Sequence, residues 1–462
     1  MRFMLGLLGI LLVVAVFGQT ATELINKAIT AHGGDKAVRQ MAQSGLWGKE
    51  YRLNGVVIPL TIWQRGDWIR LDYQMEVGVA TKVVTPDTAW QRFPGGDSVD
   101  APILEAGSIR ESRRHTLKLL LDAQQGLALT SVVGAEKLPD GRDAIRMDTI
   151  APKTSLWFDQ SSGLVIGLSY RAYSDIARKE ADLLSIFSDY KMVEGAQIPG
   201  IELQYVDGKQ TVEVRTQSVV FQTSITDSIF ARPASIFKQV GSKTPRVDWP
   251  SVPAAPVFTG TYECLIDGKA TDYSETFSRY KVTGGWAVKS IVQSRNYRLD
   301  THDEVNGSFR PTLSVTLRTL PSRTDGIEVT WRDINPRVRA FGEAEGTITL
   351  TLPSREYWLF SGAFASLFWP SPSSEGSTFS LTRFSFNTTA PGSLLGGWTS
   401  SLITYVGKET LVLPAGNFET VHYRQSTTDY WIDQSRRLVV KVQYSPALIY
   451  QLKTISGEKP PP

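Results

Sequence analysis

Few side chains of this 462-residue chain have the types and spacing that catalysis needs. The four histidines (His32, His115, His302 and His422) are scattered, and no HExxH, CxxC or paired-His motif accompanies them, so the sequence indicates no metal site. Residues 235–238 spell S-x-x-K, an acyl-enzyme motif, but neither the SDN nor the KTG motif that belongs with it is found. We therefore predict a protein that is not an enzyme and that uses no cofactor.

Two carboxylates lie in a short segment that is repeated in the chain. Ser155–Tyr170 reads SLWFDQSSGLVIGLSY, and Asp429–Tyr444 reads DYWIDQSRRLVVKVQY, with a Trp, an Asp-Gln-Ser and a Leu-Val in register. Apolar runs on both sides of a turn-forming stretch are typical of a β-hairpin, and Asp159, Asp433 and Gly163 have the types that tight turns need. We interpret the two Asp residues as turn residues, and the repeat as a sign of two duplicated domains.

The N-terminus indicates export. Arg2 precedes an apolar run from Phe3 to Phe17, which small residues follow, and this is the pattern of a secretory signal peptide at residues 1–21. A membrane anchor would need a longer apolar span. We predict a periplasmic protein that is not an integral membrane protein. Its single cysteine, Cys264, allows no internal disulfide, so its stability must come from packing.

Composition and length favour two globular domains. Hydrophobic residues make up 42% of the chain, and the net charge is only +3 with no basic run, which argues against nucleic acid as a partner. Residues 234–256 lack periodicity and are rich in proline, as linkers are. We predict a first domain at residues 22–233, this linker, a second domain at residues 257–455 and a disordered tail at residues 456–462.

Helical signals are confined to three places in the first half. Thr20 and Glu23 have the spacing of a capping box before a helix that should end at His32, and Asp35 can cap a second short helix. Apolar spacing changes to that of a helix over Ile109–Leu129, with Leu117, Leu120 and Leu121 on one side and Arg113, Arg114 and Lys118 on the other. Strands are expected at residues 56–63, 68–75, 79–84 and 88–93, and in the second half at residues 260–266, 286–294, 312–320, 327–334 and 346–353. Residues 357–370 are expected to form a helix or a buried turn.

A sheet of many strands with one apolar face needs a cover, and these helices are the only candidates in the first half. In residues 68–75 the apolar side chains alternate with polar ones, so that Ile69, Leu71 and Tyr73 share one face and Arg70 lies on the other. The 12 Trp and 19 Phe residues exceed the evident needs of two small cores. A cavity for an apolar ligand would explain them, and so would packing in the core.

The first half resembles exported proteins with the LolA/LolB fold, the periplasmic carriers of outer-membrane lipoproteins. The resemblance rests on the opening INKAITAHGGDKAVRQMAQSGLWGK, on RGDWIRLDYQ, on the first hairpin and on the closing SIFARP, and it spans residues 21–233. The second half is more weakly similar to an exported relative, through GKETLVLPAGNFETVHYRQ and the second hairpin.

The resemblance implies a mainly β (α+β) protein of two tandem half-barrels, each a curved antiparallel sheet closed by short helices over an apolar cavity. The repeated segment would be a central hairpin of each sheet. Arg70 would lock a lid helix that includes residues 110–121. The ligand would contact Ile69, Leu71, Tyr73, Met75, Trp90, Leu117, Leu120 and Leu121. The linker and the second domain are not part of the simple carriers.

The leading functional interpretation is a non-enzymatic exported protein that binds lipid or lipoprotein acyl chains in its first half, in the context of outer-membrane lipoprotein sorting. An alternative is a structural or interaction module with filled cavities that recruits an envelope protein partner. A hydrolase of envelope lipids is the third.

Overall fold

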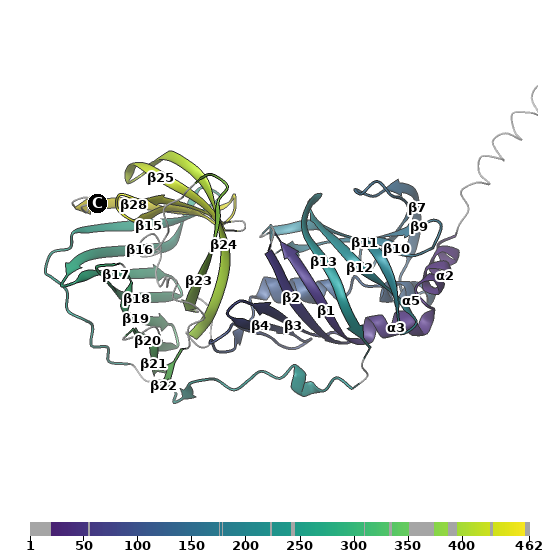
Figure 1. Ribbon diagram of the computed structural model, residues 1–462, viewed down its shortest axis with the longest axis horizontal. Coiled ribbons are helices and arrows are strands. Elements are labelled where there is room, and N and C mark those ends of the chain that lie inside the picture. The colour runs from purple at the N-terminus through teal and green to yellow at the C-terminus, as the bar shows by residue number, and fades with distance from the viewer. Residues whose placement is uncertain are drawn as a thin grey trace, which may run out of the picture. The chain divides into compact units, whose positions relative to one another are not determined.

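Two large antiparallel sheets, neither of them closed, make up most of the protein (Figure 1). The computed structural model describes residues 20–457 apart from 54–55, 175, 178, 222–223, 242–244, 309, 332–334, 351–373, 387–394 and 426–427. The contacts divide the chain into a first unit (residues 1–74, 81–89 and 101–231) and a second unit (residues 75–80, 90–100 and 232–462). The prediction of a mainly β protein with tandem half-barrels is confirmed.

The first sheet has 13 strands in the order β6-β5-β4-β3-β2-β1-β13-β12-β11-β10-β9-β8-β7, so β1 pairs with β13 in its middle. Its strands are β1 (Ser44–Leu53), β2 (Val56–Arg65), β3 (Trp68–Met75), β4 (Gly78–Val84), β5 (Ala89–Arg92), β6 (Val99–Asp100), β7 (Thr130–Lys137), β8 (Asp143–Thr149), β9 (Thr154–Asp159), β10 (Val165–Ser174), β11 (Lys179–Val193), β12 (Ala196–Val206) and β13 (Lys209–Val220).

The first two helices form as predicted, with one difference at a cap. Helix α2 (Ala21–Ala31) starts with the capping box: the Thr20 hydroxyl accepts the Glu23 N–H at 3.2 Å, and the Glu23 carboxylate accepts the Thr20 N–H at 2.8 Å. Helix α3 (Asp35–Gln43) is preceded by Gly34 at φ 89°, so Asp35 is its first residue and not its cap. The Asp35 carboxylate instead accepts from Arg39 one turn later, at 2.8 Å.

The single helical stretch expected over Ile109–Leu129 is two helices. Helix α4 (Ile103–Ser112) and helix α5 (Lys118–Gln124) are separated by a turn that points His115 inward, where its Nδ1 lies 2.6 Å from the Thr154 hydroxyl. Apolar side chains of α2, α3 and α5 then pack with those of β8, β9, β10 and β12 in one core. Residues 227–229 form a 3₁₀ turn, η1.

Both copies of the repeated segment are β-hairpins, as predicted. Asp159 ends β9, and its carboxylate accepts hydrogen bonds from the Ser162 N–H (2.6 Å) and the Ser161 hydroxyl (2.6 Å). In the second copy, the Asp433 carboxylate accepts from the Arg436 N–H at 3.1 Å. Neither hairpin is central, however: β9 is third from the β7 edge of the first sheet, and β26 is fourth from the β23 edge of the second sheet.

The second sheet has 15 strands in the order β14-β22-β21-β20-β19-β18-β17-β16-β15-β28-β27-β26-β25-β24-β23. Its strands are β14 (Lys238–Gln239), β15 (Phe258–Ile266), β16 (Lys269–Val282), β17 (Gly285–Ser294), β18 (Tyr297–Asn306), β19 (Pro311–Leu320), β20 (Arg323–Thr330), β21 (Arg337–Gly342), β22 (Ala344–Thr349), β23 (Thr378–Phe386), β24 (Leu395–Leu413), β25 (Gly416–Gln425), β26 (Thr428–Asp433), β27 (Leu438–Gln443) and β28 (Leu448–Gly457). The described residues of this unit form no helix, and the segment 357–370 lies outside the described residues.

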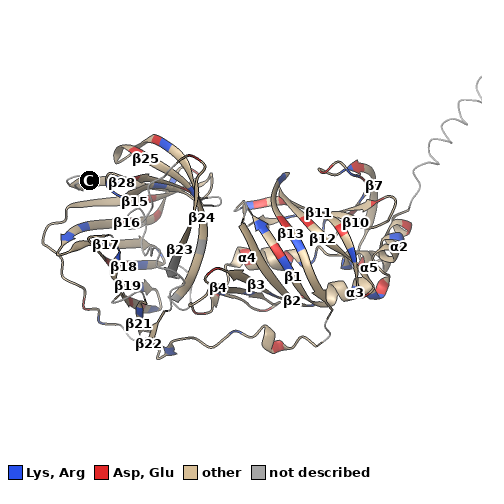
Figure 2. Ribbon diagram, in the orientation of Figure 1, with Lys and Arg blue, Asp and Glu red and all other residues tan. Residues whose placement is uncertain are grey.

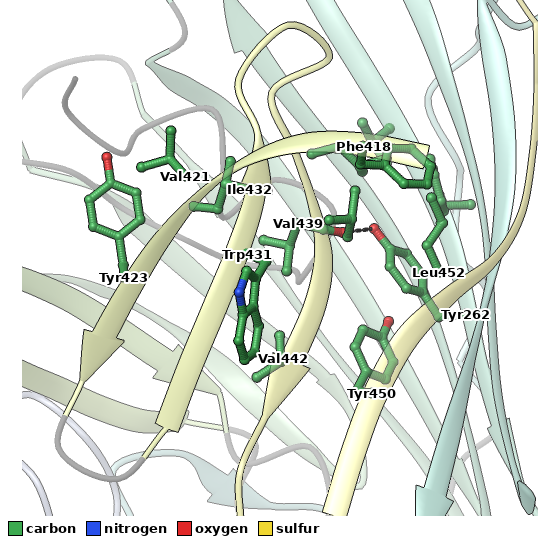
Figure 3. Packing of buried hydrophobic residues seen from close by; sticks show 14 of the residues in the cluster. Tyr262, Phe418, Val421, Tyr423, Trp431, Ile432, Val439, Val442, Tyr450 and Leu452 are labelled. Carbon is green, nitrogen blue, oxygen red and sulfur yellow. Dashed lines mark hydrogen bonds between the residues drawn. The ribbon is translucent and has the colours of Figure 1, made fainter. Parts of the chain in front are cut away.

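The core of the second unit is rich in tyrosine and other aromatic residues (Figure 3). Tyr262 is fully buried, stacks on Tyr450 with ring centroids 4.7 Å apart, and donates its hydroxyl to the Val439 carbonyl at 2.7 Å. Because that carbonyl belongs to the repeated hairpin, the bond ties β15 to β27. The unit's own side chains thus fill this part of the second half-barrel.

The beginning of the predicted linker is ordered on the second sheet. Phe237 is buried against Val338 and Ala340, and β14 pairs with β22 through Lys238 and Gln239. An apolar side chain within a proline-rich segment therefore anchors that segment to the sheet edge.

Candidate ligand-binding cavity

Helix α4 lies against the inner face of β2, β3 and β4. Its Ala106 and Ile109 pack with Leu60, Ile69 and Leu71 in one apolar cluster. Ile69 and Leu71 share this face because alternate residues of a strand point to the same side. The sequence therefore identified the inner face correctly, but α4 covers these residues.

Polar side chains tie α4 to the sheet through backbone carbonyls. The Ser108 hydroxyl donates to the Tyr173 carbonyl at 2.8 Å, and Arg110 Nε donates to the Thr85 carbonyl at 3.0 Å. Lys82 on β4 also pairs with Glu105. These contacts hold α4 between the end of β10 and the end of β4.

The other residues predicted to contact a ligand are dispersed. Tyr73 joins the cluster under α4, while Leu120 and Leu121 are fully buried in the core with α2 and α3. Met75 and Trp90 fall in the second unit, where Trp90 is buried. Of the eight predicted contact residues, only Leu117 lines the cavity described below.

Arg70 does not occupy the position that the resemblance implied. Its guanidinium donates to the Asp72 carboxylate at 3.0 Å and to the Ile229 carbonyl of η1 at 2.9 Å. As the neighbour of Ile69 and Leu71 it points to the opposite, outer face of the strand, away from α4. Arg70 therefore holds the end of the first unit against β3.

A cavity of about 360 Å³ opens on the inner face beside the turn between α4 and α5. Its volume is within the range of small-molecule sites. The side chains that line it come from α3, β1, β2, the α4–α5 turn and β10 to β13: Met41, Trp47, Lys49, Gln64, Ser112, Arg113, His115, Thr116, Leu117, Leu168, Tyr170, Ser185, Phe187, Tyr190, Pro199, Glu202, Gln204 and Thr216, with Ala42.

The opposite face of the same strands is polar. Glu50 and Arg52 of β1 lie beside Glu213 and Arg215 of β13, where they form ion pairs, and Figure 2 shows charges of both signs along these two strands. Trp47 and Lys49 have the other parity on β1 and point inward. The alternation on β1 thus separates a solvated outer face from the cavity wall.

One carboxylate in the cavity wall has its own donors. Glu202 accepts from the Ser185 hydroxyl at 2.8 Å and from the Gln204 amide at 2.9 Å, and it lies 3.8 Å from the Lys49 ammonium. The charges of Glu202 and Lys49 therefore balance each other within the wall.

His115 and Tyr170 form an uncharged part of the wall. The two rings stack with centroids 4.0 Å apart, and the Nε2 of His115 lies 3.0 Å from the Glu111 carboxylate. Burial lowers the pKa of His115 and raises the pKa of the Tyr170 hydroxyl, so both rings are neutral at pH 7. They offer the cavity flat, weakly polar surfaces.

Arg113 is placed differently from what its sequence position suggested. The helical pattern put it on the polar side of one long helix, but it follows the last residue of α4 and lines the cavity. Its Nη2 donates to the carbonyls of Gly66 at 3.0 Å and Ala42 at 3.3 Å. Burial lowers the pKa of this guanidinium, although arginine keeps its charge at neutral pH.

Sequence reasoning missed most of the cavity wall. Trp47, Leu168, Phe187 and Thr216 lie on four strands whose pairing across the sheet is not a local property of the sequence. The alternation along each strand can be read from the sequence, but the sequence does not tell which strands will face the helices.

No helix among the described residues has the length and apolar character that a membrane span needs. In the same part of the chain, no group of three or more His, Cys, Asp or Glu could hold a metal ion.

No protein-family model matches this chain, and no curated protein matches it. Among solved structures it is similar to a LolA superfamily protein from Nitrosomonas europaea (12% identity, TM-score 0.32, 46% of this chain and 98% of that chain). It is similar to a β-barrel-like protein of a domain of unknown function, DUF1849, from Brucella abortus (7% identity, TM-score 0.30, 45% of this chain and 100% of that chain). A third is an exported protein with a YmcC-like fold from Bacteroides fragilis (12% identity, TM-score 0.19, 44% and 98%). The LolA resemblance read from the sequence is thus also found among structures, and at these TM-scores it carries no argument about the ligand.

Proposed function

We propose that the first unit is a non-enzymatic binding module that takes a lipid, or the acyl chain of a lipoprotein, into the cavity beside α4 and α5. The observation that carries this proposal is the cavity itself. It measures about 360 Å³, a volume that a small-molecule site needs, and it lies on the inner face of the sheet beside the helices. Aromatic and aliphatic side chains such as Leu168, Tyr170 and Phe187 form much of its wall.

The signal-peptide pattern at residues 1–21 supports a periplasmic location for this activity. Binding of acyl chains would fit a part in lipoprotein sorting, with an envelope protein as donor or acceptor. The second unit, whose described core is filled by its own aromatic side chains, fits a structural or interaction role better than a second carrier site.

Filling the cavity tests the proposal. Thr216 on β13 lines the cavity, and its neighbour Gln217 is exposed, so Thr216→Trp places an indole in the cavity while Gln217→Trp, the matched control, places one in solvent. We expect the wild-type chain to bind the uncharged fluorescent probe N-phenyl-1-naphthylamine. Thr216→Trp should weaken that binding by about tenfold or more, the equivalent of about 1.4 kcal/mol, and Gln217→Trp should leave it within about twofold. Equal binding by all three chains would show that the probe does not enter this cavity.

A further inference from the structure

Two buried hydrogen-bond donors in the cavity wall have no acceptor among the described residues. They are Nε of Arg113 and Nε1 of Trp47, and both side chains line the 360 Å³ cavity. A buried polar atom without a partner costs free energy, so such an atom in a native wall calls for an explanation. Two of them beside the same cavity point to an acceptor that the chain itself does not supply.

The Arg113 guanidinium also makes no ion pair among the described residues, although a longer-range interaction with Asp67 favours its charge. Its other hydrogen bonds go to the carbonyls of Ala42 and Gly66, and no carboxylate of the described residues lies within 4.0 Å of it. Lys49, the second cation in the wall, already has Glu202. A buried charge is costly unless it is paired, and of these two cations Arg113 is the one that lacks an ion pair within 4.0 Å among the described residues.

The indole ring of Trp47 is held by two neighbours. Its indole makes an edge contact with Phe221, with ring centroids 6.0 Å apart, and the Lys49 ammonium lies 5.5 Å from the centre of the ring. An indole nitrogen can only donate a hydrogen bond, as can a guanidinium. The group that satisfies both must be an acceptor, and an anionic one bonds most strongly to a guanidinium.

Other acidic groups near the cavity do not oppose an anion strongly, because each has its own donors. Glu111 accepts from Arg114 at 3.1 Å and lies 3.0 Å from His115, while Glu202 has Lys49 and two neutral donors. Apolar side chains continue the wall away from the donors through Leu117, Leu168 and Phe187.

We propose that this cavity selects a single-chain anionic amphiphile, whose carboxylate or phosphate head accepts hydrogen bonds from Arg113 Nε and Trp47 Nε1 while its hydrocarbon chain packs against Leu117, Leu168 and Phe187. The inference rests on the proposed function and adds the charge of the ligand to it. Arg113 also borders a second, more polar hollow of about 680 Å³ that includes Asp67 and Lys118, whereas Trp47 lines only the first. The effect of substituting Trp47 therefore distinguishes a head in the first hollow from a head in the second.

The test compares two ligands that differ in the head alone. Laurate and dodecanol are titrated against the full chain by displacement of N-phenyl-1-naphthylamine, with acetate and inorganic phosphate as heads without a chain. We expect laurate to bind at least about tenfold more tightly than dodecanol, because a hydrogen-bonded charge pair adds to the same apolar contact. Arg113→Gln should reduce that ratio to near one, because it removes the positive charge with which only the laurate head can pair. Trp47→Phe, which keeps the ring, should reduce the ratio by about threefold.

Arg171→Gln is the control, because Arg171 is exposed and lines neither hollow. Its laurate-to-dodecanol ratio should equal that of the wild type. The inference fails, and the proposed function stands, if wild type binds both ligands equally or if Arg113→Gln and Trp47→Phe leave the ratio unchanged. An unchanged ratio in Trp47→Phe alone would move the head to the second hollow and overturn the site. Tight binding of acetate or phosphate alone would show an anion site without lipid. If neither laurate nor dodecanol displaces the probe, the proposed function itself fails.

Discussion

The two repeated hairpins are built alike, down to the neighbours of their tryptophans. The indole N–H of Trp157 donates to Glu136 two strands away, and that of Trp431 donates to Glu409 in the same relative place. Across the adjacent strand, Arg146 is the register partner of Trp157, and His422 is the partner of Trp431. Arg146 lies 5.5 Å from the first indole centre, and the His422 ring stacks on the second at 4.5 Å.

The two units that contain these hairpins bury different titratable groups. The first unit buries a neutral imidazole: His32 accepts the Val165 N–H at its Nε2 and donates from its Nδ1 to the Gln197 carbonyl. The second unit buries a carboxyl group, Glu275, and an ion pair between Arg318 and Asp325. The same hairpin geometry therefore occurs in two units with different buried titratable groups, because its own hydrogen bonds are satisfied locally at the turn.

The largest expected effect of this difference is on the buried ion pair. Arg318 is fully buried and donates twice to Asp325, at 2.7 and 3.0 Å. Arg318→Met leaves that carboxylate without its main partner and should destabilise the second unit by about 3–5 kcal/mol. Hydrogen exchange followed by mass spectrometry should show the loss in peptides of β19 and β20, with peptides of the first unit unchanged.

Arg298→Met is the matched control for that experiment. Arg298 makes the same two-pronged contact with Asp300, at 2.8 Å for both bonds, but its side chain is 47% exposed. Exposed pairs contribute little, so we expect a loss below about 1 kcal/mol. Equal losses in the two variants would contradict the distinction between the pairs.

The two units should respond to pH in opposite directions. Burial lowers the pKa of His32 to about 4, so the unfolded chain binds more protons between pH 4 and 6.5, and the first unit loses stability as the pH falls through that range. Burial raises the pKa of Glu275 to about 7, so the folded chain binds more protons, and the second unit loses stability as the pH rises from about 4.5 to 7. Each effect is of the order of 3 kcal/mol.

Hydrogen exchange between pH 5 and 8, corrected for the intrinsic exchange rate, can measure how the stability of each unit changes with pH in one sample. Glu275→Gln retains an acceptor for the Tyr450 hydroxyl and should be more stable than wild type at pH 8, without the loss of stability toward high pH in the second unit. Slopes of the same sign in the two units would show that at least one of the two buried groups does not control the stability of its unit.

The smallest effect concerns the last turn position of the two hairpins, which is Gly163 in the first and Arg437 in the second. Gly163 has φ 80°, and the aligned Arg437 has φ 48°, a region that disfavours residues with a Cβ. Arg437→Gly should therefore stabilise its hairpin by about 0.5–1 kcal/mol, whereas Gly163→Ala should destabilise the first hairpin by a similar amount. Thermal unfolding of the single variants and of the double variant measures both signs. The idea is wrong if both substitutions have the same sign.

Local signals explain what the sequence predicted well. The capping box of α2, the alternation of β3 and both hairpin turns depend on residues within a few positions of one another. The cavity depends on strands whose order in the sheet is set by distant pairing, such as β1 with β13. The orientation of Arg113 was predicted wrongly for a related reason. The helical pattern of the sequence places it on the polar side, but the chain leaves the helix after α4, and Arg113 lines the cavity.

The helical cover of the first unit is fastened mainly to main-chain oxygens, since Ser108, Arg110 and Arg113 all donate to carbonyls. Every amino acid presents such an oxygen, so replacements at the acceptor positions Thr85, Gly66 or Tyr173 do not remove the acceptor. These three bonds therefore survive mutation on the sheet side and are lost by mutation on the helix side, whereas the pair of Glu105 with Lys82 depends on both side chains. Sequence drift in the strands can then reshape the cavity wall, and with it the ligands accepted, while the cover stays attached.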